Sequence, residues 1–265
     1  MTEQVILSVE GPVATIRLNR PEVGNSIDMG SAQALLKASI QCDQDPAIRC
    51  VILTGTGRLF CAGGDLETFR AAGDQVPGLL SELAGILHLA ISRLQRMGKP
   101  LVVLVNGPAA GAGLSLAISG DIVLSARSAH FTAAYSAVGL SPDGGLTWNL
   151  PRLIGLRKAQ EMVVLNKRVP SQQAEDIGLI TRAVDDDKLL AEGIELAETL
   201  ARSATGALGG TRRLLLETYE DGLEAHLEKE ARSIAALSAG LEAREGISAF
   251  VGKRKPIFYR GVENG

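Results

Sequence analysis

The stretch NGPAAGAGLSL (106–116) follows directly on the apolar run LVVLV (101–105). The apolar run predicts a buried strand, and the LSL pattern after the small residues predicts the start of a helix. A strand-to-helix junction is normally polar, yet no charged residue occurs between Lys99 and Asp121. Glycine and alanine leave the N–H groups of a helix N-terminus open to a ligand. The junction therefore predicts a place where a substrate contacts the backbone itself.

A second junction of this kind is TGTGRLFCAGGD (54–65). It follows a strand predicted over 49–55. It precedes a predicted helix that begins at about Asp65, with Asp65 as its N-cap. Similar strand and helix units recur before about residue 185, and helical patterning is nearly continuous from about residue 187. The other predicted elements are a hairpin of strands 4–10 and 13–19, a helix over 28–42 capped by Ser26 or Asp28, a helix over 78–97 and a strand over 121–126. We predict an α/β core over 1–200 and a C-terminal helical region over 201–265.

Composition narrows the function classes. The 265 residues carry a net charge of −3, which does not indicate nucleic-acid binding. We find no signal peptide and no apolar run that approaches the length of a membrane span, so no membrane partner is expected. The three cysteines (Cys42, Cys50 and Cys61) are odd in number and lack CxxC spacing. They predict reduced thiols and a cytoplasmic protein.

The common cofactor motifs are missing from the sequence. GAGLSL lacks the third glycine of a dinucleotide fingerprint, and neither GxxxxGK[ST] nor GxSxG occurs. The three histidines (His88, His130 and His226) are far apart and show no ligand spacing. His88 stands among apolar residues of a predicted helix, which favours a structural role. We therefore expect neither a metal nor a separate cofactor.

The two Gly-rich junctions have two interpretations. Each could be a tight turn whose glycines let a helix pack closely. Alternatively, two helix N-termini aimed at one point would supply two N–H donors for a developing oxyanion. Either junction alone favours the first interpretation.

Together the junctions resemble the crotonase, or enoyl-CoA hydratase/isomerase, superfamily, in particular its ring-epoxide isomerases of phenylacetate catabolism. The resemblance covers essentially the whole chain and rests on FCAGGDL (60–66), NGPAAGAG with LSLAISGDIVLSARSAHF (106–131), LNRPEVGNSID (18–28), GLSPDGGLTWNLPRLIG (139–155) and AREGISAFVGKRKPIF (243–258). It implies a spiral of ββα units with a C-terminal helical region that forms homotrimers or hexamers. It also implies acyl-CoA thioester substrates, with coenzyme A as part of the substrate.

The resemblance also implies site residues. The oxyanion donors would be the backbone N–H groups of Gly64 and Ala112, where the family often has glycine at the second position. The residues implied to surround the substrate beside these donors are Ala62, Gly63, Gly111 and Gly113. Lys253 and Lys255 would approach the phosphates of coenzyme A, although KRKPIF (253–258) also reads as a solvated basic terminus.

The sequence departs from the hydratases of the family at their two glutamates. These would fall at Ser115 and near Tyr135, so neither position is a carboxylate, and Tyr135 is predicted to border the site. Another acid, Asp143 in SPDGG, is available. Pro-Asp-Gly is common in turns, but the ring-epoxide isomerases place an active carboxylate here. We interpret Asp143 as the acid/base.

These residues predict an acyl-CoA isomerase. One carboxylate suffices to move a proton from C2 to C4 of a 3-enoyl thioester, or to assist rearrangement of a ring epoxide. The alternatives are a hydratase with an unconventional acid, a dehalogenase-like enzyme whose aspartate attacks an aromatic ring, and a non-catalytic binder of acyl-CoA. An RNA-associated relative is disfavoured by the acidic charge balance.

Overall fold

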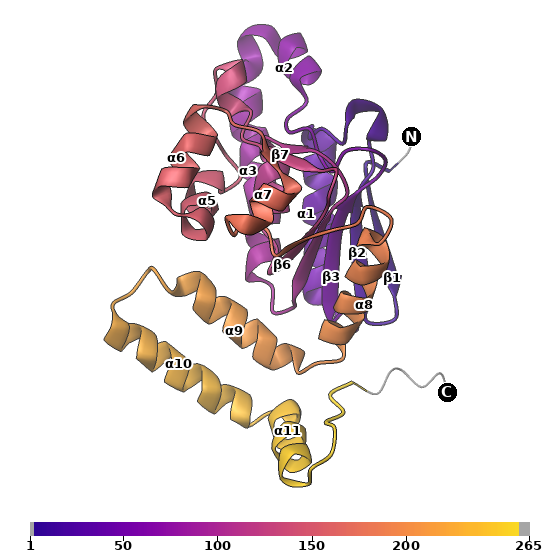
Figure 1. The fold of residues 1–265 in the computed structure, drawn as a ribbon, viewed down its shortest axis with the longest axis vertical. Coiled ribbons are helices and arrows are strands. Elements are labelled where there is room, and N and C mark those ends of the chain that lie inside the picture. The colour runs from indigo at the N-terminus through magenta and orange to yellow at the C-terminus, as the bar shows by residue number, and fades with distance from the viewer. Residues whose placement is uncertain (1–2, 260–265) are drawn as a thin grey trace.

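The fold is built on a six-stranded sheet, seen in the computed structural model, which describes residues 3–259 (Figure 1). The strand order is β1-β2-β3-β4-β6-β9. The first two strands form the predicted antiparallel hairpin, and the remaining neighbours pair in parallel. The strands are β1 (Val5–Glu10), β2 (Val13–Leu18), β3 (Cys50–Gly55), β4 (Leu101–Val105), β6 (Ile122–Ala126) and β9 (Arg182–Val184).

A smaller sheet, ordered β5-β7-β8, consists of β5 (Ala109–Ala110), β7 (His130–Thr132) and β8 (Val169–Pro170). β5 follows β4 and β7 follows β6, so a strand of the large sheet is followed by a strand of the small one. Cys61, after β3, repeats this step by forming a parallel bridge to Ala109. The repetition confirms the predicted α/β fold of ββα units.

Helices cover the large sheet. Those of the first part of the chain are α1 (Met29–Gln44), α2 (Leu66–Ala72), α3 (Val76–Arg96), α4 (Ala112–Ala117), α5 (Leu146–Ile154), α6 (Leu156–Val164), α7 (Ser171–Asp176) and α8 (Leu189–Ala201), with 3₁₀ helices η1 (Pro21–Val23), η2 (Gly73–Gln75) and η3 (Tyr135–Val138). Of the two predicted caps of α1, Asp28 is the one used, and its carboxylate accepts the Ser31 N–H at 2.8 Å. β3 and β4 are buried along their whole length, as expected for parallel strands covered on both faces.

The helical stretch Leu66–Arg96, which joins α2, η2 and α3, is 31 residues long and, by length and composition alone, apolar enough to span a membrane. The prediction that no run approaches this length was therefore wrong. In the fold α3 packs along α1 and buries Leu83, Leu87 and Leu94 in the core. Only 22% of the most apolar window of this stretch is buried, so α3 contributes one face to the core and leaves the rest uncovered in this chain.

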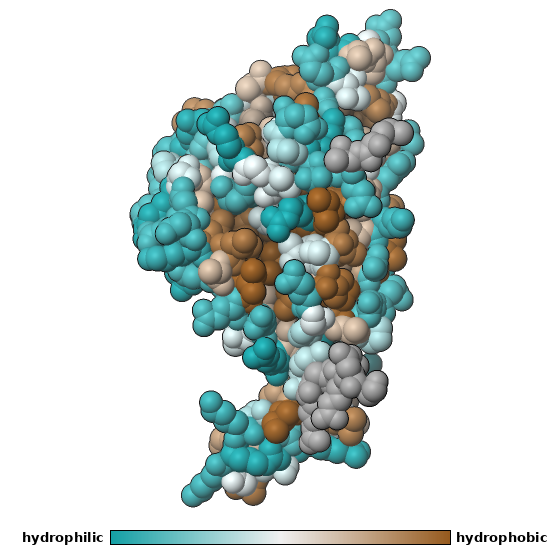
Figure 2. All heavy atoms as spheres, turned by 90° about the vertical axis from the view of Figure 1, so that its right-hand side faces the viewer, coloured by the Kyte–Doolittle hydropathy of each residue, from teal (hydrophilic) through white to brown (hydrophobic). Residues whose placement is uncertain are grey.

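Three helices follow α8: α9 (Thr205–Glu217), α10 (Leu223–Ser238) and α11 (Leu241–Val251). Arg212 fastens α9 to the core by donating to the backbone carbonyls of Met97 and Lys99. α10 and α11 extend away from the sheets (Figure 1), and a side view shows this end projecting below the main body (Figure 2). The predicted boundary after residue 200 lies at the end of α8, and residues 260–265 of the predicted C-terminal region lie outside the described residues.

Candidate active site

A cavity of about 280 Å³ lies where both Gly-rich junctions meet α3 and the segment after β7. Its walls are largely apolar, and α3 contributes one helical face to them. The lining residues are Ile27, Ala62, Gly63, Gly64, Leu66, Phe69, Leu80, Leu83, Ala84, Leu87, Gly111, Ala112, Ala134, Tyr135, Val138, Leu140, Ser141 and Asp143. Most of the residues singled out in the sequence are thus placed around one space.

The first junction is shaped by Gly63, which has φ +104°. A Cβ at this residue would lie 3.0 Å from the carbonyl oxygen of Ala110, so only glycine fits without displacement. The Gly63 N–H points to Cys61 Sγ at 3.5 Å, and its carbonyl accepts the Ile27 N–H at 2.7 Å. The next N–H, that of Gly64, has no acceptor among residues 3–259. It is free to donate into the cavity that Gly64 lines.

The second junction turns at Gly111, with φ +54°, and α4 begins at Ala112. As the first residue of a helix, Ala112 has no intrahelical acceptor for its N–H, and the described part of the chain supplies none. Gly113 is required for another reason, since a Cβ there would overlap the Cys61 carbonyl. Gly113 therefore faces the first junction and does not line the cavity, unlike Ala62, Gly63 and Gly111.

Asp143 supplies a carboxylate to the same cavity, and among the lining residues just named it is the only one. Tyr135 donates its hydroxyl to Asp143 Oδ1 at 2.6 Å. Ser115 is fully buried, and its Oγ donates to the Asp143 backbone carbonyl at 2.9 Å. Ser115 and Tyr135, at and near which the resemblance implied the glutamates of hydratases, thus both hold Asp143.

Tyr135 remains a hydrogen-bond donor through the neutral pH range. Burial raises the pKa of its phenol well above the ordinary value, and the negative charge of Asp143 raises it further. A phenol with this pKa keeps its proton and directs it to the carboxylate. The hydrogen bond from Tyr135 can therefore hold the Asp143 carboxylate in a fixed position.

His88 is a neighbour of the site that sequence analysis missed, because its apolar surroundings predicted only a structural role. Its Nε2 accepts the Gly144 N–H at 3.0 Å and lies 3.7 Å from Asp143 Oδ2. One signal was available in the sequence: His88 continues the helical face of Leu80, Ala84 and Leu87, which line the cavity. A polar residue beside an apolar helical face could have been selected from the sequence, although His88 itself does not line the cavity.

Lys253 and Lys255 lie outside the cavity. Both follow α11 and are exposed, and α11 stands at the opposite end of the molecule from α2 (Figure 1). Within one chain the structure does not bring these lysines to the site.

The thiols are not suited to act as nucleophiles. All three cysteines are free and buried, in agreement with the sequence analysis. Burial raises the pKa of each thiol to about 12. Across the described residues no three histidine, cysteine, aspartate or glutamate side chains gather as a metal site.

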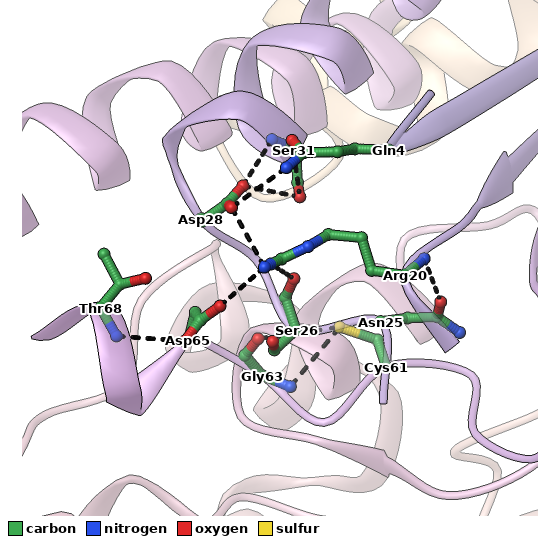
Figure 3. Close-up of polar contacts among 10 residues, drawn as sticks. All are labelled: Gln4, Arg20, Asn25, Ser26, Asp28, Ser31, Cys61, Gly63, Asp65 and Thr68. Atoms are coloured by element: carbon green, nitrogen blue, oxygen red, sulfur yellow. Dashed lines mark hydrogen bonds and ion pairs between the residues drawn. The ribbon is translucent and has the colours of Figure 1, made fainter. Parts of the chain in front are cut away.

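A cluster of charged side chains, Arg20, Asp28 and Asp65, packs beside the first junction (Figure 3). Arg20 pairs with Asp65 at 2.9 Å and with Asp28 at 3.2 Å, and its guanidinium also donates to the Ser26 carbonyl. Asp65 caps α2 by accepting the Thr68 N–H, as predicted. The Arg20 and Asp65 side chains are only 15% and 10% exposed. The cluster therefore fixes the position of Asp65, the residue that follows Gly64.

We predict that Asp65→Asn lowers the free energy of unfolding by about 1–3 kcal/mol near neutral pH, the usual cost of losing hydrogen bonds to a charged group. Burial raises the pKa of Asp65, but hydrogen bonds from Thr68 and Arg20 outweigh burial and lower it overall. The charged form therefore stabilises the fold above the unfolded pKa of about 4, and this contribution is lost as pH falls through the folded pKa. Urea unfolding at several pH values should show the gap between the two proteins narrowing in acid.

Glu67→Gln provides the matched control on the same helix. Glu67 pairs with Arg70, but both side chains are 79% exposed, and exposed pairs contribute little to stability. Equal losses in the two variants, or a gap that is constant with pH, would contradict the role given to Asp65.

Comparisons with known proteins agree over nearly the whole chain. A sequence profile described as enoyl-CoA hydratase/isomerase matches residues 8–261. The chain is 39% identical to the 1,2-epoxyphenylacetyl-CoA isomerase of Escherichia coli (strain K12), covering 97% of this chain and 99% of that protein. It is 32% identical to the 2,3-dehydroadipyl-CoA hydratase of the same organism, over 96% and 98% of the two chains. The crystal structure of an enoyl-CoA hydratase from Polaromonas sp. JS666 superposes with a TM-score of 0.91 at 33% identity, covering 95% and 98% of the two chains.

Proposed function

The chain belongs to the enoyl-CoA hydratase/isomerase family, and from this premise we propose that it is an acyl-CoA isomerase with Asp143 as its acid and base. One observation carries the proposal. Two backbone N–H groups that have no acceptor among residues 3–259, those of Gly64 and Ala112, and one carboxylate, that of Asp143, line a single largely apolar cavity. An acyl thioester in this cavity would meet two donors for its oxygen and one group able to move a proton.

In the proposed reaction the thioester oxygen accepts hydrogen bonds from Gly64 and Ala112. Asp143 removes a proton from C2 of a 3-enoyl thioester, and the electron pair moves onto the oxygen to give an enolate. The two N–H groups stabilise this growing charge. Asp143 then returns the proton to C4, so that the double bond moves to the 2,3 position. No atom is gained or lost, and no cofactor besides the coenzyme A of the substrate takes part.

Hydration has a different requirement. It needs one group to activate water and another to supply or shuttle a proton, and the described residues that line the cavity include no second carboxylate. Ser115 is fully buried, and the hydroxyl of Tyr135 is directed at Asp143. A single acid that both takes and returns a proton fits isomerisation better.

A ring-epoxide thioester is a second candidate substrate, favoured by the 39% identity to the 1,2-epoxyphenylacetyl-CoA isomerase. The same two N–H groups would hold the thioester oxygen while the three-membered ring opens to a seven-membered oxygen heterocycle. The apolar walls formed by Phe69, Leu83 and Leu87 suit a ring as well as a chain.

The test is to incubate the purified protein with 3-hexenoyl-CoA, with the ring-epoxide thioester and, separately, with crotonyl-CoA. We expect rearrangement of at least one of the first two, measured by chromatography of the thioesters. Efficient hydration of crotonyl-CoA without isomerisation would replace the proposal by the hydratase alternative. Binding of acyl-CoA without turnover of any of the three would replace it by the inert binder.

We also propose that the chain assembles as a homotrimer, or as a hexamer of two trimers, in the cytoplasm. The helices α10 and α11 expose large apolar side chains, namely Leu223, Leu227, Ile234, Leu241, Ile247, Phe250 and Val251. Apolar surface gathered in this way is typical of an interface. In such an assembly Lys253 and Lys255 could reach the coenzyme A phosphates of a neighbouring site. Light scattering should give the mass of three or six chains, and a monomer would contradict the proposal.

A further inference from the structure

The peptide after Asp143 depends on a single side chain for its hydrogen bond. Gly144 is buried, and its N–H donates to Nε2 of His88 at 3.0 Å. A buried N–H without an acceptor is costly, so this bond fixes the position of the peptide. Gly144 also has φ +62°, and a Cβ there would overlap Ser115. The backbone at Gly144 thus packs between His88 of α3 and Ser115 of α4, and its N–H has little room to turn to another acceptor.

Asp143 is held at three points. Tyr135 binds its carboxylate, Ser115 binds its carbonyl, and His88 binds the N–H that follows it. Of these three partners only histidine changes its charge between about pH 5 and 8. The third point of attachment can therefore respond to pH while the other two stay in place.

The bond to Gly144 requires a neutral imidazole. Nε2 accepts a proton only when it carries none, so His88 must hold its proton on Nδ1. Protonation makes both ring nitrogens donors, and the Gly144 bond is lost. The same Nε2 lies 3.7 Å from Asp143 Oδ2, close enough to form an ion pair after a small movement. His88 Nε2 therefore cannot bind the Gly144 N–H and form an ion pair with the Asp143 carboxylate at the same time.

Charged groups also line a second cavity that His88 borders. This cavity of about 410 Å³ adjoins Gly144, and Arg96 from α3 and Glu220 after α9 share its lining with His88. α5 faces the same cavity with the uncharged Trp148 and Asn149. Asp143 itself is faced by Tyr135 from η3 and the uncharged Ser115 from α4. Among the ion pairs within 4 Å in the described chain, the Asp143 carboxylate pairs only with His88, at 3.7 Å.

From this geometry we propose that His88 is a positioning residue for Asp143, holding the peptide after it when neutral and withdrawing its carboxylate when protonated. The proposal rests on the isomerase function in one respect, that Asp143 acts as the base. His88 does not line the cavity that holds the substrate. It therefore acts on kcat through Asp143 and leaves KM nearly unchanged.

The kinetic test compares two variants. His88→Leu removes the acceptor, and we expect kcat to fall about tenfold to a hundredfold, the scale of a small misplacement of a reacting group. His88→Gln offers an amide oxygen to Gly144 but does not titrate, so it should restore most of kcat and flatten the decline of activity toward acid pH. His130→Gln, in β7 and outside both cavities, is the control and should keep the profile of the parent protein. Parent-like kcat and an unchanged pH profile in both His88 variants would overturn the proposal.

A second measurement does not depend on activity. Labelling aspartate carbonyls with ¹³C and glycine amides with ¹⁵N selects two amide signals, because the sequence has two Asp-Gly pairs, 143–144 and 221–222. We expect the Gly144 signal to follow the titration of His88 and to lose this dependence in His88→Gln, while Gly222 behaves alike in both proteins. A Gly144 signal that ignores His88 would overturn the proposal. A signal that follows His88 in a protein without isomerase activity would leave the positioning intact and refute the proposed function instead.

Discussion

Asp143→Asn is expected to lower kcat for migration of the double bond by about 10²–10⁴-fold, the usual contribution of a general acid/base. Asparagine has nearly the same shape and still offers an oxygen to the Tyr135 hydroxyl, which binds Asp143 at 2.6 Å in the parent protein. It cannot accept the proton from C2. The loss should therefore appear in kcat, with KM for 3-hexenoyl-CoA almost constant.

Asp143→Glu is the matched variant. It keeps a carboxylate but moves it by one methylene group, away from the position set by Tyr135 and Ser115. We expect activity between that of the parent protein and that of the asparagine variant. Thermal unfolding of all three proteins shows whether the fold is kept. Undiminished turnover in a folded Asp143→Asn protein would mean that another group moves the proton.

The outline of this site could be read from the sequence because its main parts are local. A strand followed by small residues and a helix is a continuous pattern, so the two Gly-rich junctions and the cap at Asp65 could be located without any tertiary contact, although the donors within them, Gly64 and Ala112, were selected by the resemblance. The strands β3 and β4 could also be located, since a short apolar run bounded by turn residues is typical of a buried strand. Asp143, by contrast, was selected by a resemblance, because its own pattern is that of a turn.

What the sequence could not supply depends on packing between distant segments. His88 and Gly144 are 56 residues apart, and only the packing of α3 against the segment before α5 joins them. The glycines of the second junction look equivalent in sequence, yet Gly111 lines the cavity and Gly113 packs on Cys61. The strands β5 and β8, two residues each, are too short to show any periodicity.

The second large effect is expected from removing a backbone N–H donor, which most substitutions leave in place because they change only the side chain. At Gly64 a test is impractical, since any Cβ would overlap the ring of Phe69 and disturb the cavity. Ala112 is better placed. It is the first residue of α4, a position that tolerates proline because its N–H has no intrahelical acceptor. The preceding residue is Gly111, which lacks the Cβ that would clash with a proline ring.

We expect Ala112→Pro to lower kcat by about 10²–10³-fold, the typical cost of one oxyanion-hole donor. The proline removes the N–H and places its ring where that donor would meet the thioester oxygen. Ala112→Gly keeps the N–H, so it should retain activity within a few-fold of the parent protein and lose only the helix propensity of alanine, about 1 kcal/mol. The hydrogen bond strengthens as charge develops, so kcat should fall further than the affinity for a saturated acyl-CoA, which calorimetry measures and which the proline ring also lowers. Equal losses in both variants would assign the effect to disturbed packing of α4. Full activity in Ala112→Pro would exclude this N–H from the reaction and with it the two-donor site.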